Sequence, residues 1–207
     1  MDSELRAGVA VYNAGHYHAA HDAWEERWLD LPEGDDDERF LHGLIQFTAA
    51  VYHARERNWS GATGLAESGG DYLADLPPDY RGVNVGTVRD YLAALRRDPE
   101  RIERASPPAL AFEGDALGLT DLDFDATAVA AEVLAEDLGH DEGVVEQAAR
   151  YARADLADGD EGSQFVTFLL DFVREPEHRG IVAQRLSEHV DRRAHRESDV
   201  DGLFDER

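Results

Sequence analysis

The chain has 207 residues, a formal net charge of −25 from 45 acidic and 20 basic residues, and no cysteine. Its length allows one large domain or two small ones, and an apolar fraction of 43% is enough for a hydrophobic core, which argues against global disorder. The lack of cysteine excludes disulfides, thiolate metal sites and cysteine nucleophiles.

Helical periodicity dominates residues 1–98, which we expect to form a helical bundle. The apolar stripes predict helices at about 5–12, 16–29, 38–57, 60–76 and 87–97. The third of these is apolar on most of its circumference, which is typical of a helix in the centre of a bundle. Asn58 is expected to cap the helix that follows it.

The composition changes after the bundle. Residues 99–124 contain Ser106-Pro107-Pro108 and scattered glycines, which predict a linker or an extended strap over the bundle, without strands. Residues 125–193 predict four further helices, the first two capped by Asp125 and Asp141.

The third of these C-terminal helices carries a row of aromatic residues. Phe165, Phe168 and Phe172 need an apolar partner surface, either within the chain or on another copy in a homo-oligomer. Residues 194–207 predict an acidic, frayed tail. The expected fold class is therefore all-α: a helical bundle with an appended C-terminal helical unit.

Ionisable residues stand on two of the predicted helices. His21 and Glu25 are four residues apart, so they share one face of the second helix, and Asp22 flanks them. A polar ribbon on the third helix, at spacings of four, three and four, consists of His42, Gln46, Ala49 and His53. If the two helices pack antiparallel, both polar faces turn toward one interior space.

This cluster predicts a functional site. We interpret His21, His53 and Glu25 as ligands of a divalent metal ion, the expected cofactor. The residues expected to orient them are Gln46, Asp22 and Trp24. His21 and Glu25 are also the expected catalytic residues, because apolar surroundings bring carboxylate pKa values near neutrality, and metal-assisted hydrolysis is the reaction class.

An alternative interpretation gives the same residues no chemistry. In it, the histidines and the carboxylate form a structural hydrogen-bond network inside a non-catalytic interaction or oligomerisation module. His16, His18 and His42 are weaker site candidates, because histidines at loop ends and on surfaces are common. The chain has no His-Glu-x-x-His motif, no phosphate-binding glycine loop and no nucleophile elbow.

Several motifs occur in a fixed order between residues 7 and 76. They are Asn13-x-Gly15-x-Tyr17-x-x-Ala20-His21-x-x-Trp24-Glu25-x-x-Trp28, Phe40-x-x-Gly43-Leu44-Ile45-Gln46, Tyr52-His53 and Asn58-x-x-Gly61-Ala62. In these motifs the chain resembles DUF family 309, a family of small all-helical proteins known as domains of unknown function. The resemblance implies an all-α fold and no established activity.

The family's signature residues map onto this sequence. Its His–Trp–Glu signature corresponds to His21, Trp24 and Glu25, and its second histidine to His53. The family usually has glutamate directly after the first histidine, where this chain has Asp22, and the shorter side chain makes a role as direct ligand less secure.

The charge pattern bears on environment and partners. All basic residues are arginine, and the acidic residues are spread along the chain, which favours adaptation to a salt-saturated cytosol over a charge-based partner such as a basic protein. Without a basic patch, we expect no nucleic-acid binding. The start Met1-Asp2-Ser3-Glu4 is no secretory signal, and no apolar segment is long enough to span a membrane, so we expect a soluble cytoplasmic protein.

Overall fold

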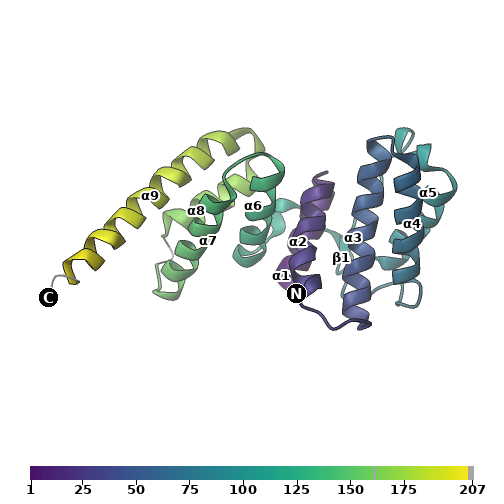
Figure 1. Cartoon of the computed structure of the whole chain (residues 1–207), viewed down its shortest axis with the longest axis horizontal. Helices are drawn as coiled ribbons and strands as arrows, with labels where there is room; N and C mark the ends of the chain where they lie inside the picture. The colour runs from purple at the N-terminus through teal and green to yellow at the C-terminus, as the bar shows by residue number, and fades with distance from the viewer. Residues whose placement is uncertain (161, 205–207) are drawn as a thin grey trace.

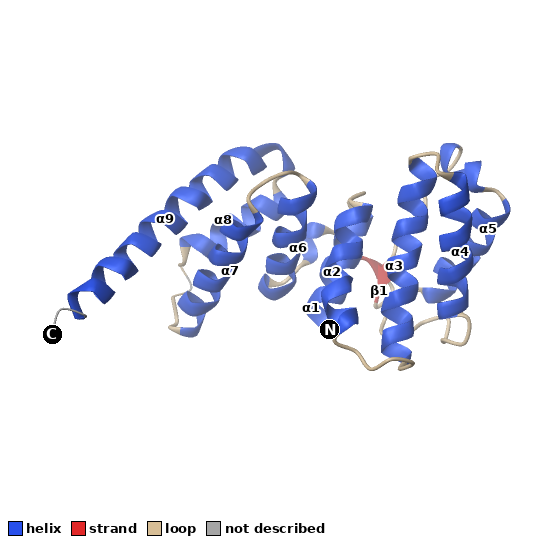
Figure 2. Ribbon diagram, in the orientation of Figure 1, coloured by secondary structure: helices blue, strands red, loops and turns tan. Residues whose placement is uncertain are grey.

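The computed structural model describes residues 1–160 and 162–204, and its described part is built almost entirely of helices (Figures 1 and 2). The N-terminal helices are α1 (Asp2–Asn13), α2 (Tyr17–Leu29), α3 (Asp36–Arg55), α4 (Trp59–Leu73) and α5 (Val85–Arg97). The C-terminal helices are α6 (Phe124–Asp137), α7 (Glu142–Ala157), α8 (Gln164–Arg174) and α9 (Arg179–Phe204). The predicted all-α fold class is confirmed.

The N-terminal helices pack around α3, which lies between α2 and α4 (Figure 1). Its apolar circumference explains this central place, and Phe40 and Phe47 are fully buried in the resulting core. Glycines allow two close contacts in the bundle. A Cβ at Gly8 would lie 2.1 Å from Trp24 Nε1, and one at Gly43 would lie 2.5 Å from Leu73.

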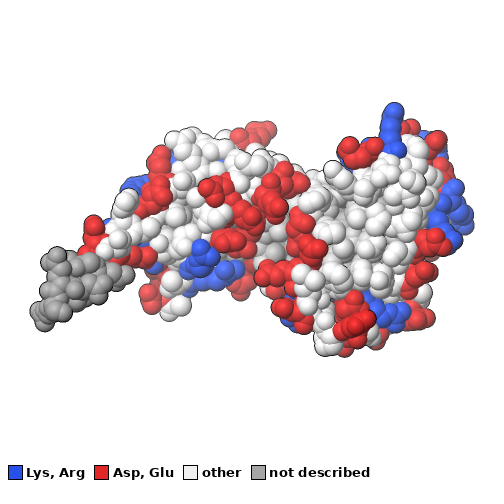
Figure 3. All heavy atoms as spheres, viewed as in Figure 1, with Lys and Arg blue, Asp and Glu red and all other residues white. Residues whose placement is uncertain are grey.

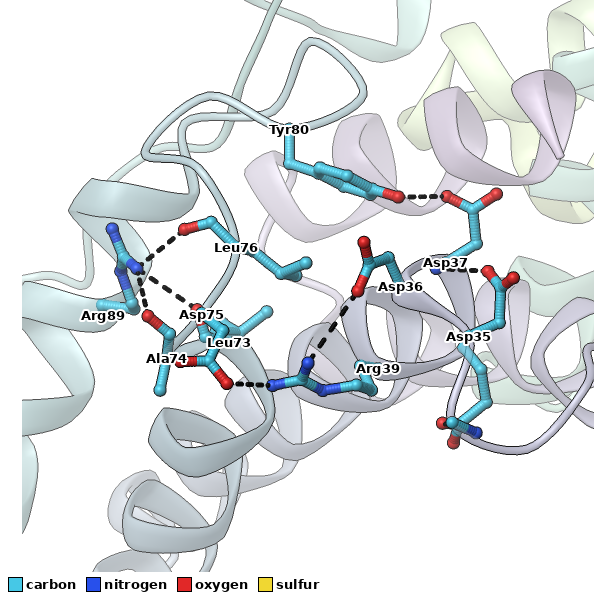
Figure 4. A network of polar contacts seen from close by, with 12 residues as sticks. Asp35, Asp36, Asp37, Arg39, Leu73, Ala74, Asp75, Leu76, Tyr80 and Arg89 are labelled. Carbon is cyan, nitrogen blue, oxygen red and sulfur yellow. Dashed lines mark hydrogen bonds and ion pairs between the residues drawn. The ribbon is translucent and has the colours of Figure 1, made fainter.

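A polar network fastens the loop after α4 to the start of α3 (Figure 4). Asp37 accepts hydrogen bonds from Tyr80 Oη at 2.8 Å and from Arg81 Nε at 2.8 Å. Arg89 on α5 donates to carbonyl oxygens at the end of α4, those of Leu73 and Ala74, and to that of Leu76 in the loop that follows. These bonds satisfy carbonyls that a helix end leaves without partners, so the C-terminal end of α4 is fixed in place.

Residues 99–124 lie over the bundle as a strap. Asn13, in the turn that ends α1, donates through Nδ2 to Leu110 O at 2.8 Å and to Leu117 O at 2.9 Å. Its Oδ1 accepts from Leu110 N at 2.8 Å. Of the two predicted forms, linker or strap, these contacts correspond to a strap.

The strap contains a small hairpin, so the prediction that it has no strand is wrong. Strands β1 (Ala111–Phe112) and β2 (Asp115–Ala116) pair antiparallel across Glu113 and Gly114. Both loop residues have positive φ, 52° and 94°, as in the tight turns that match the twist of two-residue hairpins. Such turns usually carry Asn-Gly or Asp-Gly, so Glu-Gly gave little signal. The short 3₁₀ turns of the strap are Pro99–Glu103 and Leu119–Asp121.

The C-terminal helices confirm some predicted caps and correct another. Asp141 caps α7 by accepting from Val144 N at 3.2 Å, as predicted. The cap of α6 is Asp123, which accepts from Ala126 N at 3.0 Å, and not Asp125. Asp125 lies in the first helical turn, where its charge is favourable to the helix dipole.

The aromatic row on α8 finds its partner surface within the chain. Phe165 and Phe172 are buried, and the Phe168 ring lies 5.0 Å from the ring of His189 on α9. Self-association of these helices stays a prediction. Helix α9 continues to Phe204, through most of the segment predicted as a frayed tail, and residues 205–207 lie outside the described residues.

One hydrophobic cluster of buried residues runs through both groups of helices, joined where α6 packs on α1 and α2. The predicted boundaries at residues 98 and 125 therefore stay predictions. No helix in the described part of the chain is both long and apolar enough to cross a membrane.

Candidate functional site

Helix α2 carries two histidine–carboxylate pairs. It buries a narrow stripe of small residues with one tryptophan, namely Ala19, Ala20, Ala23 and Trp24. Beside this stripe, His21 Nε2 lies 3.7 Å from Glu25 Oε1, and His18 Nδ1 lies 2.9 Å from Asp22 Oδ2. Both pairs have the spacing of one helical turn, and the two imidazole rings are stacked with centroids 6.2 Å apart.

Three of these side chains form a candidate metal-binding triplet: His21, Asp22 and Glu25. Each offers one ligand atom, and the three atoms lie within 4.8 Å of one another. Ligand bonds to zinc are about 2.0–2.2 Å long, so atoms bound to one ion are about 3–4 Å apart. The three ligand atoms are therefore somewhat farther apart than atoms bound to one ion would be.

The triplet is only partly buried, and the prediction of a fully buried cluster is wrong. The side chain of His21 is 28% exposed and that of Glu25 is 48% exposed. The physical reason is that α2 buries only a narrow stripe of its surface. His21, Asp22 and Glu25 lie directly beside this stripe, so their side chains are partly exposed to solvent.

His21, one member of the triplet, lines a cavity between α2 and α3. The cavity has a volume of about 220 Å³ and is lined by Tyr17, His18, His21, Ala49, Tyr52 and His53. The predicted antiparallel packing of the two helices therefore brings His21 and His53 to one space. His53 stands in the cavity wall but is not part of the triplet of mutually close ligand atoms found among the described residues.

His53 has a defined partner at the end of α3. Asn58 Nδ2 lies 2.9 Å from His53 Nδ1, while Asn58 Oδ1 accepts from Gly61 N at 3.1 Å. Asn58 therefore caps α4, as predicted, and orients the His53 ring at the same time. With Nδ1 in this bond, Nε2 is the ring atom left for chemistry in the cavity.

Two of the predicted orienting residues lie elsewhere. Trp24 is fully buried, and its Nε1 donates to Leu5 O at 3.4 Å. Gln46 turns toward α4, where a Cβ built at Gly69 would lie 3.1 Å from Gln46 Cβ. His18, which the sequence ranked low, stands in the cavity wall, and its four-residue spacing to Asp22 was the available signal.

Carboxylates surround the other side of the triplet. Asp22 and Glu25, but not His21, line a cleft of about 600 Å³ between α2, α6 and α7. On the face shown in Figure 3, acidic residues gather where these helices meet. Burial raises the pKa of the Asp22 carboxyl above its ordinary value. The neighbouring His18 and His21 oppose this rise, and Glu136 on α6 adds to it. The adaptation to high salt that the sequence predicted stays a prediction.

Fold and site together define an all-α protein with a histidine–carboxylate triplet on the surface of α2. Residues 5–65 match the family model described as "Domain of unknown function (DUF309)", which confirms the resemblance in the N-terminal third of the chain. A curated relative, described as an uncharacterized protein of Aquifex aeolicus (strain VF5), is 26% identical over 108 residues. The match covers 52% of this chain and 31% of that relative, so the chain spans about a third of the relative's length. Neither description names an activity.

Proposed function

We propose that the protein binds a divalent transition-metal ion through His21, Asp22 and Glu25 and uses it to hydrolyse a small substrate held in the adjoining cavity. The observation that carries this proposal is the set of three ligand atoms within 4.8 Å of one another, one of them on His21 in the wall of that cavity. An imidazole nitrogen with two carboxylate oxygens is a donor set that suits zinc, manganese, iron or nickel.

The surroundings of the triplet support a catalytic role for the bound metal ion rather than metal storage. A bound ion would polarise a substrate carbonyl or phosphoryl oxygen and lower the pKa of bound water. His53 lines the same cavity as His21, so its ring is the group we assign to proton transfer. Tyr52, 41% exposed, forms part of the same wall and limits the size of the substrate.

The alternative of a purely structural network has less support. Such a network predicts buried, hydrogen-bonded partners, because burial is what makes an unmade bond costly. Here His21 and Glu25 are 3.7 Å apart, beyond hydrogen-bond distance, and half of the Glu25 side chain is exposed. The pair therefore contributes little to folding.

Metal binding is tested by equilibrium dialysis of the full chain against zinc, manganese, nickel and iron(II). Molar KCl in the buffer screens unspecific binding to the acidic surface. The matched control is His178→Ala, because His178 and Glu175 form another exposed histidine–carboxylate pair, at 2.9 Å. We expect one tightly bound ion in the native protein and in His178→Ala, and at least about tenfold weaker binding in His21→Ala. Equal affinity in His21→Ala, or no binding above pH 6, would overturn the proposal.

Hydrolysis is tested on the metal-loaded protein with a panel of small esters, amides and phosphate esters. His53→Ala is expected to keep the metal and lose turnover, because it lies outside the triplet. Turnover that survives both His21→Ala and His53→Ala would show that the activity belongs to another site or a contaminant.

A further inference from the structure

A second hollow lies at the other end of α2 and α3. It has a volume of about 880 Å³, within the range of small-molecule sites, and it lies between the end of α2, the following loop, α3 and α4. Gly64 and Ser68, one turn apart on α4, line it. A Cβ at Gly64 would meet no atom within 4 Å, so the small residues of α4 keep this cleft open.

Aromatic rings form one wall of the cleft. The His42 ring lies between Trp28, at a centroid distance of 4.5 Å, and Tyr72, at 3.8 Å and nearly parallel. All three residues line the cleft. The indole and phenol rings are therefore held in fixed positions, and aromatic faces attract cations through their quadrupole.

Glu38 brings a largely buried negative charge to the same wall. Its side chain is only 13% exposed, and it accepts hydrogen bonds from Trp28 Nε1 at 2.8 Å and Gly34 N at 3.3 Å. Burial alone would raise the pKa of Glu38, but these donors and the nearby His42 hold it below its ordinary value. Among the described residues no arginine pairs with this carboxylate; the ring of His42, 3.4 Å away, is its only ionisable partner.

Most of the other charged side chains in the cleft are negative. Three more carboxylates line it, those of Glu33, Glu67 and Asp71, and of these Glu67 pairs with Arg96 at 2.7 Å. The single arginine in its lining is Arg39, which pairs with Asp75 at 3.1 Å and with Asp36 at 3.8 Å. The cleft thus presents a negative potential together with apolar, aromatic walls.

We propose that this cleft is a binding site for a small organic ammonium ion, with its charged head beside Glu38 and its apolar substituents against Trp28 and Tyr72. A metal ion is a poor match, because aromatic walls offer it no ligands, whereas an alkylated ammonium group uses carboxylate and ring together. The site is separate from the triplet. None of His21, Asp22 and Glu25 lines the cleft.

The probe for this proposal is choline, and its matched control is the uncharged isostere 3,3-dimethylbutan-1-ol, both titrated at constant total salt. The readout is the indole N–H signal of Trp28 in proton–nitrogen NMR spectra, assigned with Trp28→Phe. We expect saturable shifts with choline and binding at least about tenfold weaker for the uncharged alcohol. Equal binding of the two compounds, or no shift with choline, would overturn the proposal.

Variants locate the ligand. Gly64→Leu is expected to fill the cleft and abolish binding without loss of folding, because its helix position is open and leucine favours helix. Glu33→Gln is expected to weaken binding, whereas Glu177→Gln, an exposed acid remote from the cleft, leaves it unchanged. His21→Ala should also leave choline binding unchanged, which separates this proposal from the metal site. Undiminished binding in Gly64→Leu would place the ligand elsewhere.

Discussion

His42 and His53 belong to the same polar ribbon on α3, but their surroundings differ. His42 is packed between two aromatic rings beside the nearly buried Glu38. His53 stands in the wall of an open cavity and bonds to Asn58. The spacing along α3 determines that both side chains share a face, whereas α2 and α4 determine what each one meets. At the cleft end of α3, His42 is packed among other side chains. At the cavity end, His53 is accessible from the cavity.

The largest expected effect is the stabilisation of the protein by a bound metal ion, which should depend on the cavity end of α3 and not on the cleft end. At a free metal concentration of about a hundred times Kd, binding should stabilise the native state by about 2.7 kcal/mol. We expect this gain to persist in His42→Ala and to fall by about half or more in His21→Ala, measured by urea denaturation with and without metal. Loss of the gain in His42→Ala would mean that the ion sits at the cleft end.

Removal of a carboxylate should affect stability at one end only. Glu38→Ala leaves the Trp28 indole N–H without its acceptor in a largely buried place, and we expect it to cost about 1–3 kcal/mol. Glu25→Ala, with a half-exposed side chain, should change the free energy of unfolding by less than about 0.5 kcal/mol. Equal costs would contradict the contrast between a structural and an accessible end.

The hydrogen bond between Asn58 and His53 allows the contributions of these two residues to stability to be compared at the cavity end. Asn58→Ala removes the cap of α4 and should cost about 1 kcal/mol. His53→Ala removes the same side-chain bond but keeps the cap, so the expected cost is below about 0.5 kcal/mol. Thermal or urea unfolding of the two variants measures the difference, and a larger loss in His53→Ala would assign His53 a structural role.

The smallest expected effect is a difference in pH dependence. The pKa of Glu38 is lower in the folded state, so its contribution to stability is present above its unfolded pKa near 4.3 and disappears as the pH falls further. The pKa of Asp22 is raised by burial, so its ionisation opposes folding as the pH rises through and above its unfolded value near 3.9.

Two amide variants test these opposite signs between pH 3 and 7. Glu38→Gln should lose stability relative to the native protein above about pH 4 and approach it in acid. Asp22→Asn should gain less than about 1 kcal/mol near neutral pH and lose that gain in acid. Parallel stability curves for the two variants would contradict the assigned directions.

Local signals in the sequence were sufficient for helices and for several caps. Asn58 and Asp141 stand before apolar periodic runs and form the predicted bonds. Two acids compete for the start of α6, and periodicity does not tell Asp123 from Asp125, because both precede the first buried turn. The antiparallel meeting of His21 and His53 also followed from spacing and a short loop.

Contacts between distant segments were beyond the sequence. Tyr72 comes from α4, and nothing in its spacing shows that it stacks on His42. The cleft depends on the absence of a side chain at Gly64. From the sequence alone, a glycine in a helix indicates only a lower helix propensity. The exposure of Glu25 depends on how little of α2 is covered, which is a property of packing and not of periodicity.

Asn13 holds the strap by hydrogen bonds, and this limits which fragments of the protein can keep the native structure. The same hydrophobic cluster contains α1 and three buried residues of the strap, Leu110, Phe112 and Leu122. A fragment that stops at residue 98 would therefore expose apolar surface. It would also leave the amide of Asn13 without its three hydrogen bonds. The stretch that matches the family model thus relies on residues more than forty positions beyond its end. Ligand or metal measurements on an excised N-terminal piece would describe a different, partly uncovered molecule.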